Sequence, residues 1–175
     1  MAKTNYIKVA KKSAGIQISE LKKINKVFDK SFVKAVETLS NCKGKVICAG
    51  VGKSGIIARK VSATLSSIGI SSFFCDPGTA RHGDMGQINS NDVVILISLS
   101  GSSNELKNII QFCSRNRSIK LIVITSNKQS ILYKNSDIKV FIPNVKEAGP
   151  GNFVPTSSTT NQLALGDAIA VSYTH

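Results

Sequence analysis

The sequence predicts an α/β protein: a three-layer α/β/α sandwich, flavodoxin-like or Rossmann-like, with a five-stranded parallel sheet and preceding N-terminal helices. Short, almost continuously apolar runs recur after residue 44, and such runs are typical of strands buried on both faces. Segments with helical periodicity separate them, as in a parallel sheet covered by helices. At 175 residues, the chain is long enough for one domain with a sizeable core.

The N-terminal part is predicted to be helical over residues 3–13 and about 18–40, with Gly15 between the two helices. In the second helix, apolar residues recur near the 3.6-residue period and lysines occupy the other face. Two helices lack the three-helix body and recognition helix of a compact helix-turn-helix domain. We therefore expect residues 1–40 to be basic helices that pack on a domain formed by residues 41–175.

The rest of the chain alternates between strands and helices. Apolar runs such as KVICA and DVVILIS predict strands at residues 45–49, 70–75, 92–98, 119–125 and 138–142. Stretches with helical spacing predict helices at about residues 54–68, 103–116, 129–134 and 157–172. Two irregular segments, residues 76–86 and 143–155, contain the turn-forming glycines and prolines.

The composition is that of an ordinary globular protein, with 42% hydrophobic and 19% charged residues. No apolar run reaches the length of a membrane span, and the N-terminus has no apolar signal segment, so a cytoplasmic location without membrane contact is expected. The four cysteines form no C-x-x-C pair and are interpreted as reduced core thiols. We expect neither a metal ion nor another cofactor.

Positive charge is concentrated near the N-terminus. The net charge is +13, and residues 1–60 contain 14 Lys and Arg against three acids. Such a face could attract nucleic acid, anionic lipid or phosphorylated metabolites. Because the cluster is almost all lysine and has no interleaved aromatic residues, a solvated lysine face is the better interpretation, and nucleic acid is not expected as a partner.

A glycine-rich turn follows the first predicted strand within residues 45–60, KVICAGVGKSGIIARK. Its glycines allow close backbone approach ahead of a helix N-terminus, where free N–H groups attract anions, and Lys53 and Ser54 add a cation and a hydroxyl. A Walker A loop would require glycine where Ile47 stands, so that motif is excluded. G-x-G-x-x-G is matched, and Asp76 is placed to bind a ribose, which leaves dinucleotide binding open.

Hydroxyl side chains cluster before two further predicted helices, at the carboxyl edge of the sheet where parallel sheets bind ligands. The clusters are Ser98, Ser100, Ser102 and Ser103, and Thr156, Ser157, Ser158, Thr159 and Thr160. Hydroxyls and amides donate to phosphate oxygens, and helix N-termini favour negative charge. N-capping would explain one hydroxyl per helix, whereas clusters of this size predict phosphate binding.

Four titratable residues lie on the same loops, and each also has a simpler explanation. Glu105 could close a capping box with Ser102, and Glu147 could be a solvated loop acid. His82 could be a loop histidine without a chemical role, and Lys53 is one lysine among many. Their placement on neighbouring loops makes them candidates for catalysis.

Six short motifs occur together within about residues 10–172. They are GVGKSG at 50–55, FFCDP at 73–77, HGD at 82–84, SLSG at 98–101, KEA at 146–148 and PTSSTT at 155–160. This combination closely resembles the sugar isomerase (SIS) domain and, within that superfamily, the arabinose-5-phosphate isomerases. Family chains continue past the last helix into a His-Pro-Gly-Gly segment that supplies another active-site histidine, often followed by paired CBS domains. This chain ends at His175 and is expected to be an isolated SIS portion.

The resemblance implies an isomerase that interconverts D-ribulose 5-phosphate and D-arabinose 5-phosphate through an enediolate and supplies Kdo and lipopolysaccharide synthesis. It also implies a homotetramer with sites at subunit interfaces. The residues that match the family's active-site positions are Lys53, His82, Glu105 and Glu147. Those that match its substrate-binding and phosphate-binding positions are Gly52, Ser54, Ser98, Ser100, Ser103, Thr156, Ser157, Ser158 and Thr159. Which glutamate acts as the base stays open.

Two other functions stay open from the sequence. A non-catalytic sugar-phosphate sensor would use the same fold and the same loops. A nucleotide-binding domain would bind NAD through the glycine-rich turn, but it would leave the two later Ser/Thr clusters without a purpose.

Overall fold

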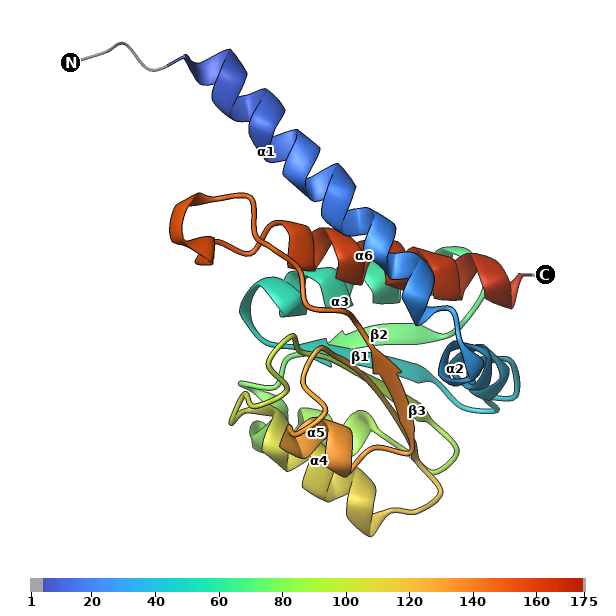
Figure 1. The fold of residues 1–175 in the computed structure, drawn as a ribbon. Helices are drawn as coiled ribbons and strands as arrows, with labels where there is room; N and C mark the ends of the chain where they lie inside the picture. Colours follow the sequence, from blue (N-terminus) through green and yellow to red (C-terminus); the bar gives the residue numbers. More distant parts are fainter. Residues whose placement is uncertain (1–4, 175) are drawn as a thin grey trace.

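The computed structural model describes residues 5–174, so residues 3 and 4 of the first predicted helix, and His175, lie outside it. Its centre is a fully parallel five-stranded sheet (Figure 1). The strands are β1 (Val46–Gly50), β2 (Ser72–Cys75), β3 (Val93–Ile97), β4 (Lys120–Thr125) and β5 (Ile138–Phe141). Their order, β2-β1-β3-β4-β5, places the switch in strand order between β1 and β3. The predicted fold class is confirmed.

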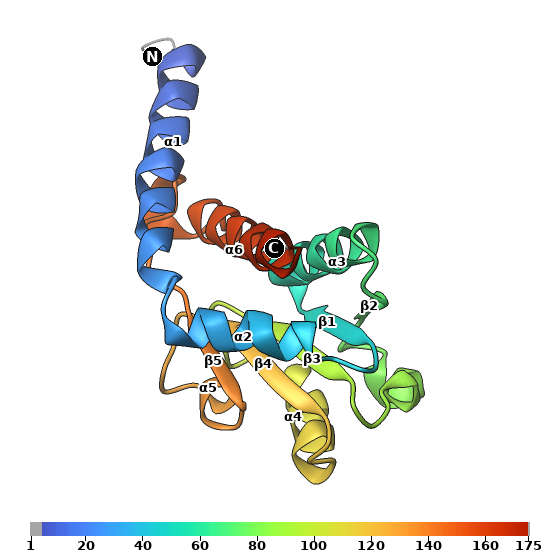
Figure 2. The ribbon, with the colours of Figure 1, turned by 90° about the vertical axis from the view of Figure 1, so that its right-hand side faces the viewer.

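Helices cover both faces of the sheet. They are α1 (Tyr6–Leu21), α2 (Lys30–Ser40), α3 (Gly52–Ser67), α4 (Leu106–Arg115), α5 (Ile131–Lys134) and α6 (Ser157–Tyr173). Four 3-10 turns are η1 (Lys22–Val27), η2 (Ala80–His82), η3 (Asp84–Gln87) and η4 (Pro150–Asn152). The helices α2, α3 and α6 share one face of the sheet, and α4 and α5 cover the other (Figure 2).

Alternate residues of the central strands enter two separate cores. In β1, Val46 and Cys48 belong to the core that contains α3 and α6, whereas Ile47 and Ala49 belong to the core that contains α4. All four side chains are fully buried. The sequence run is continuously apolar because both faces of the strand are covered.

The N-terminal helices differ from the prediction. The helix α1 runs unbroken through Gly15, which has open space around it, because one glycine costs a helix only about 1 kcal/mol. The predicted helix 18–40 is interrupted instead after η1. There the Asp29 carboxylate accepts hydrogen bonds from the N–H groups of Ser31 (2.7 Å) and Phe32 (3.2 Å), and this cap starts α2.

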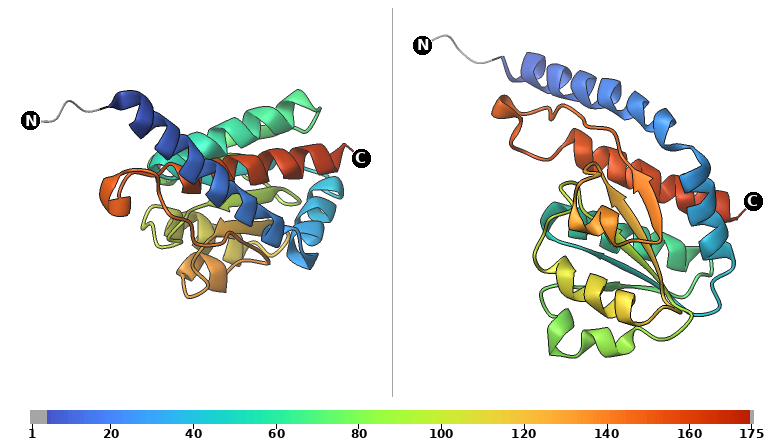
Figure 3. Two further views of the ribbon diagram at one scale, coloured as in Figure 1. Left: turned by 45° about the horizontal axis from the view of Figure 1, so that its top comes forward. Right: turned by 60° about the horizontal axis from the view of Figure 1, so that its bottom comes forward.

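Only the C-terminal half of α1 lies across α6 (Figure 3). The Thr160 hydroxyl donates to Gln17 Oε1 (3.2 Å), and the Lys146 N–H donates to Glu20 Oε2 (3.0 Å). The first turns of α1 extend away from the body, and Tyr6 is 79% exposed. Within residues 5–174, no helix combines the length and apolarity needed to cross a membrane. The division of the chain into N-terminal helices and a following domain remains a prediction.

Candidate functional site

The carboxyl end of β1 turns into α3 within two residues. Gly52 has a φ of +59°, a conformation that L side chains rarely adopt, and a Cβ at Gly55 would lie 2.5 Å from the Gly50 carbonyl oxygen. The glycines therefore let α3 begin directly above the strand. Lys53 and Ser54 occupy the first turn of α3, where free backbone N–H groups favour a bound anion.

The turn after β3 is shaped by its own serines. The buried Ser98 hydroxyl accepts a hydrogen bond from the Gly101 N–H (3.1 Å), and the Ser102 hydroxyl donates to Ser100 Oγ (3.1 Å). The helix α4 begins one residue after Glu105, which makes no capping hydrogen bond. The capping-box interpretation is therefore wrong, because the serine hydroxyls bond within the turn and the glutamate precedes the helix. The Glu105 carboxylate is exposed and makes no hydrogen bond or ion pair with the described residues.

Glu147 is buried at the N-terminus of α6, with 6% of its surface exposed. Its Oε2 accepts hydrogen bonds from the Thr156 N–H (2.7 Å), the Thr156 hydroxyl (3.0 Å) and the Ser158 N–H (3.3 Å). Burial, the largest single influence, raises the pKa of Glu147. The hydrogen bonds from Ser158 and Thr156 together outweigh it and hold that pKa below the ordinary glutamate value. The solvated-acid interpretation of Glu147 is therefore wrong, and the carboxylate caps α6.

The loop that carries Glu147 is closed on itself. The Glu147 N–H donates to Asn152 Oδ1 (2.5 Å), and the Ala148 N–H donates to Thr156 Oγ1 (2.8 Å). These bonds hold the loop against the start of α6. The backbone N–H groups that anchor the carboxylate both donate to Oε2. Within residues 5–174, Oε1 therefore has no backbone donor.

The starts of α3 and α6 and the turn after β3 meet in one hollow of about 320 Å³, which we call the cradle. It is lined by Val51, Lys53, Ser54, Ser98, Leu99, Ser100, Ser103, Pro155, Ser158 and Thr159. Most of the predicted phosphate-binding hydroxyls are thus gathered from distant parts of the chain. Two lie elsewhere: Thr156 is engaged with Glu147, and Ser157 is fully buried. The N-terminus of α3, the Lys53 ammonium and the converging hydroxyls make the cradle suitable for an anion.

Two more hollows continue the cradle along the same edge. One, of about 270 Å³, shares Val51 with the cradle and is also lined by Gly52 and Glu105. The next, of about 590 Å³, shares Glu105 and is lined by His82. The structure therefore places Glu105 beside the cradle and His82 one hollow further away. Within residues 5–174, no group of three or more His, Cys, Asp or Glu side chains is arranged to hold a metal ion.

Sequence reasoning missed three polar residues of α3 and α6. Arg59 lines the middle hollow with its guanidinium 4.3 Å from the Phe74 ring centroid, and nothing in its spacing distinguished it from a surface arginine. Asn161 and Gln162 are almost completely buried on α6. Their available signal was the absence of any charged residue over 157–166, which indicates a helix segment enclosed by protein.

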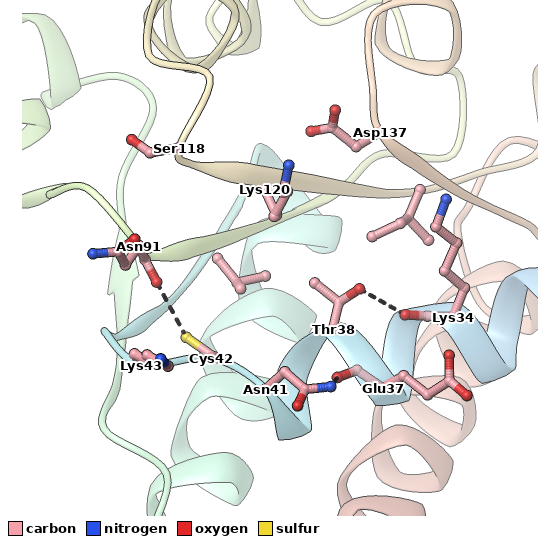
Figure 4. A pocket seen from close by; sticks show the side chains of 12 residues that line it. Lys34, Glu37, Thr38, Asn41, Cys42, Lys43, Asn91, Ser118, Lys120 and Asp137 are labelled. Atoms are coloured by element: carbon pink, nitrogen blue, oxygen red, sulfur yellow. Dashed lines mark hydrogen bonds between the residues drawn. The ribbon is translucent and has the colours of Figure 1, made fainter.

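A larger hollow, about 670 Å³, lies at the opposite, amino-terminal edge of the sheet beside α2 (Figure 4). Two of its polar side chains, on α2 and just after it, bond to the backbone of that helix. The Thr38 hydroxyl donates to the Lys34 carbonyl oxygen (2.7 Å), and Asn41 Nδ2 donates to the Glu37 carbonyl oxygen (2.8 Å). Size alone would favour this hollow as a ligand site. The cradle is the better candidate because helix N-termini and hydroxyls converge on it.

A family model and several named proteins match this sequence. A family model described as the SIS domain matches residues 38–172. The chain is 42% identical over 172 residues to arabinose 5-phosphate isomerase KdsD of Francisella tularensis, covering 97% of this chain and 52% of that protein. It is 41% identical over 160 residues to arabinose 5-phosphate isomerase KpsF of Escherichia coli O6:H1, covering 91% of this chain and 49% of that protein. The chain thus spans about half the length of the curated relatives it matches.

A solved structure is similar over nearly the whole chain. The structure of E. coli CFT073 c3406 in complex with arabinose 5-phosphate aligns with a TM-score of 0.92 and 36% sequence identity. The alignment covers 99% of this chain and 92% of that chain. The similarity therefore includes the elements that form the cradle and the N-terminal helices.

Proposed function

Because the chain belongs to the SIS domain family, we propose that it is a sugar-phosphate isomerase that interconverts D-ribulose 5-phosphate and D-arabinose 5-phosphate. The observation that carries this proposal is the cradle, in which a lysine and hydroxyls from three distant segments line one hollow. Similarity to proteins named arabinose 5-phosphate isomerase, and to a structure in complex with arabinose 5-phosphate, favours this pair of pentose phosphates.

The phosphate group is proposed to bind in the cradle. Backbone N–H groups in the first turn of α3 can donate to an anion there, and the Lys53 ammonium opposes its charge. The donors that line the hollow with exposed or half-buried hydroxyls are Ser54, Ser100, Ser103 and Thr159. Fixing the phosphate holds the other end of the sugar against the neighbouring hollow, and such positioning lowers the barrier of the chemical step by several kcal/mol.

The isomerisation moves a proton between C2 of the aldose and C1 of the ketose. A base removes the proton from C2, the C–H electron pair forms the C1–C2 double bond, and the carbonyl π pair moves to O1 to give the enediolate. O1 then takes up a proton and the C2 hydroxyl loses one, so that return of the first proton to C1 leaves the carbonyl at C2 of the ketose. This chemistry needs a positioned base and a group that stabilises the negative oxygen. We assign the second role to Lys53, and assistance with ring opening to His82.

Two carboxylates are candidates for the base, and the structure supports each differently. Glu105 lies in the hollow next to the cradle with an uncommitted carboxylate. Glu147 is held rigidly, and its lowered pKa keeps it ionised at neutral pH, while Oε1 has no backbone donor within the described chain and can accept a proton. A low pKa also makes a weaker base.

The test is to incubate the chain with ribulose 5-phosphate and follow the formation of arabinose 5-phosphate. Replacement of the base by glutamine, Glu105→Gln or Glu147→Gln, should lower turnover at least about 100-fold. Lys53→Met should also lower kcat, whereas Lys120→Met, at the amino-terminal hollow, is the matched control and should leave it unchanged. Normal turnover in either glutamine variant removes that glutamate from the role, and no product from the wild-type chain refutes the isomerase.

A non-catalytic sugar-phosphate-binding module is the second candidate. It is favoured by the separation of His82 from the cradle, since these groups line different hollows. Tight binding of arabinose 5-phosphate by calorimetry without turnover would identify this function.

We also propose an oligomeric state and a metabolic role for this chain. We propose a homotetramer, because α1 leaves the apolar side chains of Tyr6, Ile7 and Val9 exposed on the same helix that packs on α6 further along. Light scattering of the purified chain tests this, and a monomer at micromolar concentration would contradict it. Supply of Kdo and lipopolysaccharide synthesis in the cytoplasm is the corresponding metabolic proposal, and loss of Kdo on deletion of the gene would support it.

A further inference from the structure

The first turns of α6 bury polar atoms that no described residue satisfies. Gln162 is 1% exposed, and neither its Nε2 nor its Oε1 has a hydrogen-bond partner within residues 5–174. An unpartnered buried polar group lowers stability, and native proteins retain few of them. Both polar atoms of one carboxamide are left unsatisfied here, so the position of this side chain calls for a physical explanation.

Gln162 lies on α6 between the cradle and a close contact of α6 with α3. One turn before it on α6, Ser158 lines the cradle together with Ser54 of α3. One turn after it, Gly166 touches α3 so closely that a Cβ there would lie 2.2 Å from Val61 Cγ2. Since α3 and α6 both begin at the carboxyl edge, they run in the same direction, and residue 162 faces α3 beneath the cradle.

The direction of the side chain follows from helix geometry. Long helical side chains lean toward the N-terminus of their helix and cover the preceding turn. The carboxamide of Gln162 therefore lies over the turn that carries Ser158. The N–H of Ser158 is bound to Glu147 Oε2 (3.3 Å). Its hydroxyl also helps to lower the pKa of Glu147, but unlike the N–H it can rotate toward a ligand in the cradle.

We propose that Gln162 is a positioning residue that acts through the hydroxyl of Ser158 on a phosphate group bound in the cradle. A hydroxyl has one donor and two acceptor lone pairs. When it donates to a phosphate oxygen, a lone pair is left toward the helix interior, where Gln162 Nε2 can donate to it. Each bond polarises the next, so ligand binding gives Nε2 a partner and lowers the cost of the unpartnered carboxamide. The inference rests on the proposed function only in taking a phosphate ester as the ligand.

The variant Gln162→Met tests this because methionine has a similar shape and no polar atoms that must be satisfied. Without ligand, Tm should rise by about 2–4 °C, since one buried unsatisfied group has been removed. With ligand, the KM for arabinose 5-phosphate should rise about three- to tenfold, the range of one hydrogen bond, with kcat little changed. Leu165→Met, a volume-conserving change in the same helix, is the control and should leave KM unchanged. Gln162→Leu is the second variant should Gln162→Met not fold.

The directions of the changes in Tm and in KM distinguish a positioning role of Gln162 from a packing role. A merely structural Gln162 predicts that Gln162→Met lowers Tm and leaves KM unchanged, and either result overturns the inference. Calorimetry with inorganic phosphate, without turnover, gives a second readout. Phosphate binding that weakens in Gln162→Met while the wild type shows no isomerase activity supports the inference and refutes the proposed function. If the wild type turns over normally and Gln162→Met has an unchanged KM, the proposed function is supported and the inference about Gln162 is refuted. If the wild type binds neither phosphate nor sugar phosphate, the proposed function and the inference are both refuted.

Discussion

Two buried carboxylates at opposite edges of the sheet are bonded differently. At the amino-terminal edge, Asp92 uses both oxygens: Oδ1 accepts from the Lys45 N–H (2.7 Å) and Oδ2 from the Asn89 N–H (2.8 Å), with the Lys45 ammonium 3.4 Å from Oδ2. At the carboxyl edge, the backbone at the start of α6 holds Glu147 through Oε2 alone. Both acids are almost fully buried. Burial therefore does not distinguish them, but the number of oxygens held by backbone N–H groups does.

Buried acidic residues therefore serve two purposes in this fold. An acid with both oxygens engaged by backbone N–H groups and a lysine fixes the chain and can do little chemistry. An acid with one oxygen engaged in this way is equally well placed and still offers a proton acceptor. The edges themselves also differ, because the starts of α3 and α6 lie at the cradle, whereas the larger hollow lies beside the C-terminal half of α2.

Asp92→Ala should give the largest loss of stability. The change leaves two backbone N–H groups and the Lys45 ammonium without their buried partner, so the free energy of unfolding should fall by about 3–5 kcal/mol. Urea unfolding measures this. Calorimetry on the folded fraction should give unchanged affinity for phosphate ligands, and a weakened affinity would remove the distinction between the two edges.

Glu147→Gln should lower stability less and affect function as well. The amide oxygen can still accept one N–H bond, so the expected loss in the free energy of unfolding is about 1–3 kcal/mol, from the weaker bonds to Thr156 and Ser158. Affinity for phosphate ligands should fall too, because the same bonds position the start of α6. Full stability with full affinity would show that the cap is unimportant.

The stability contribution of Glu147 should depend on pH in a defined direction. Because the pKa of this carboxyl is lower in the folded than in the unfolded chain, the unfolded chain takes up the proton first on acidification. The contribution is complete above the unfolded pKa of about 4.3 and is lost as pH falls through the folded value. The difference in unfolding free energy between wild type and Glu147→Gln should therefore shrink below about pH 4; a difference that grows there would mean the opposite shift.

Asp137→Asn should give the smallest effect. Asp137 also accepts a backbone bond at the amino-terminal edge, from the Leu121 N–H (2.8 Å), but it is exposed. The free energy of unfolding should change by at most about 1 kcal/mol, as measured by urea unfolding beside Asp92→Ala. A loss as large as that of Asp92→Ala would show that burial does not decide the strength of these bonds.

Apolar runs predicted the strands well, because the central strands are covered on both faces, and every residue of β1 and β3 is buried. The predicted break between the N-terminal helices at Gly15 was wrong, because the helix tolerates this glycine. The break lies instead before α2, where Asp29 caps the helix. Convergence of the cradle residues followed from the rule for parallel sheets. The burial of Glu147 could not be predicted, because it depends on how a long loop folds back on α6.

The contact between Gly166 and Val61 bears on which ligands the cradle can accept. It lies two turns from the start of α6, and a methyl group does not fit there. A bulkier residue at either position would wedge the two helices apart and widen the space between their first turns. The size of the ligand that the cradle accepts could therefore change through substitutions in the interior, while every side chain that lines the cradle stayed the same.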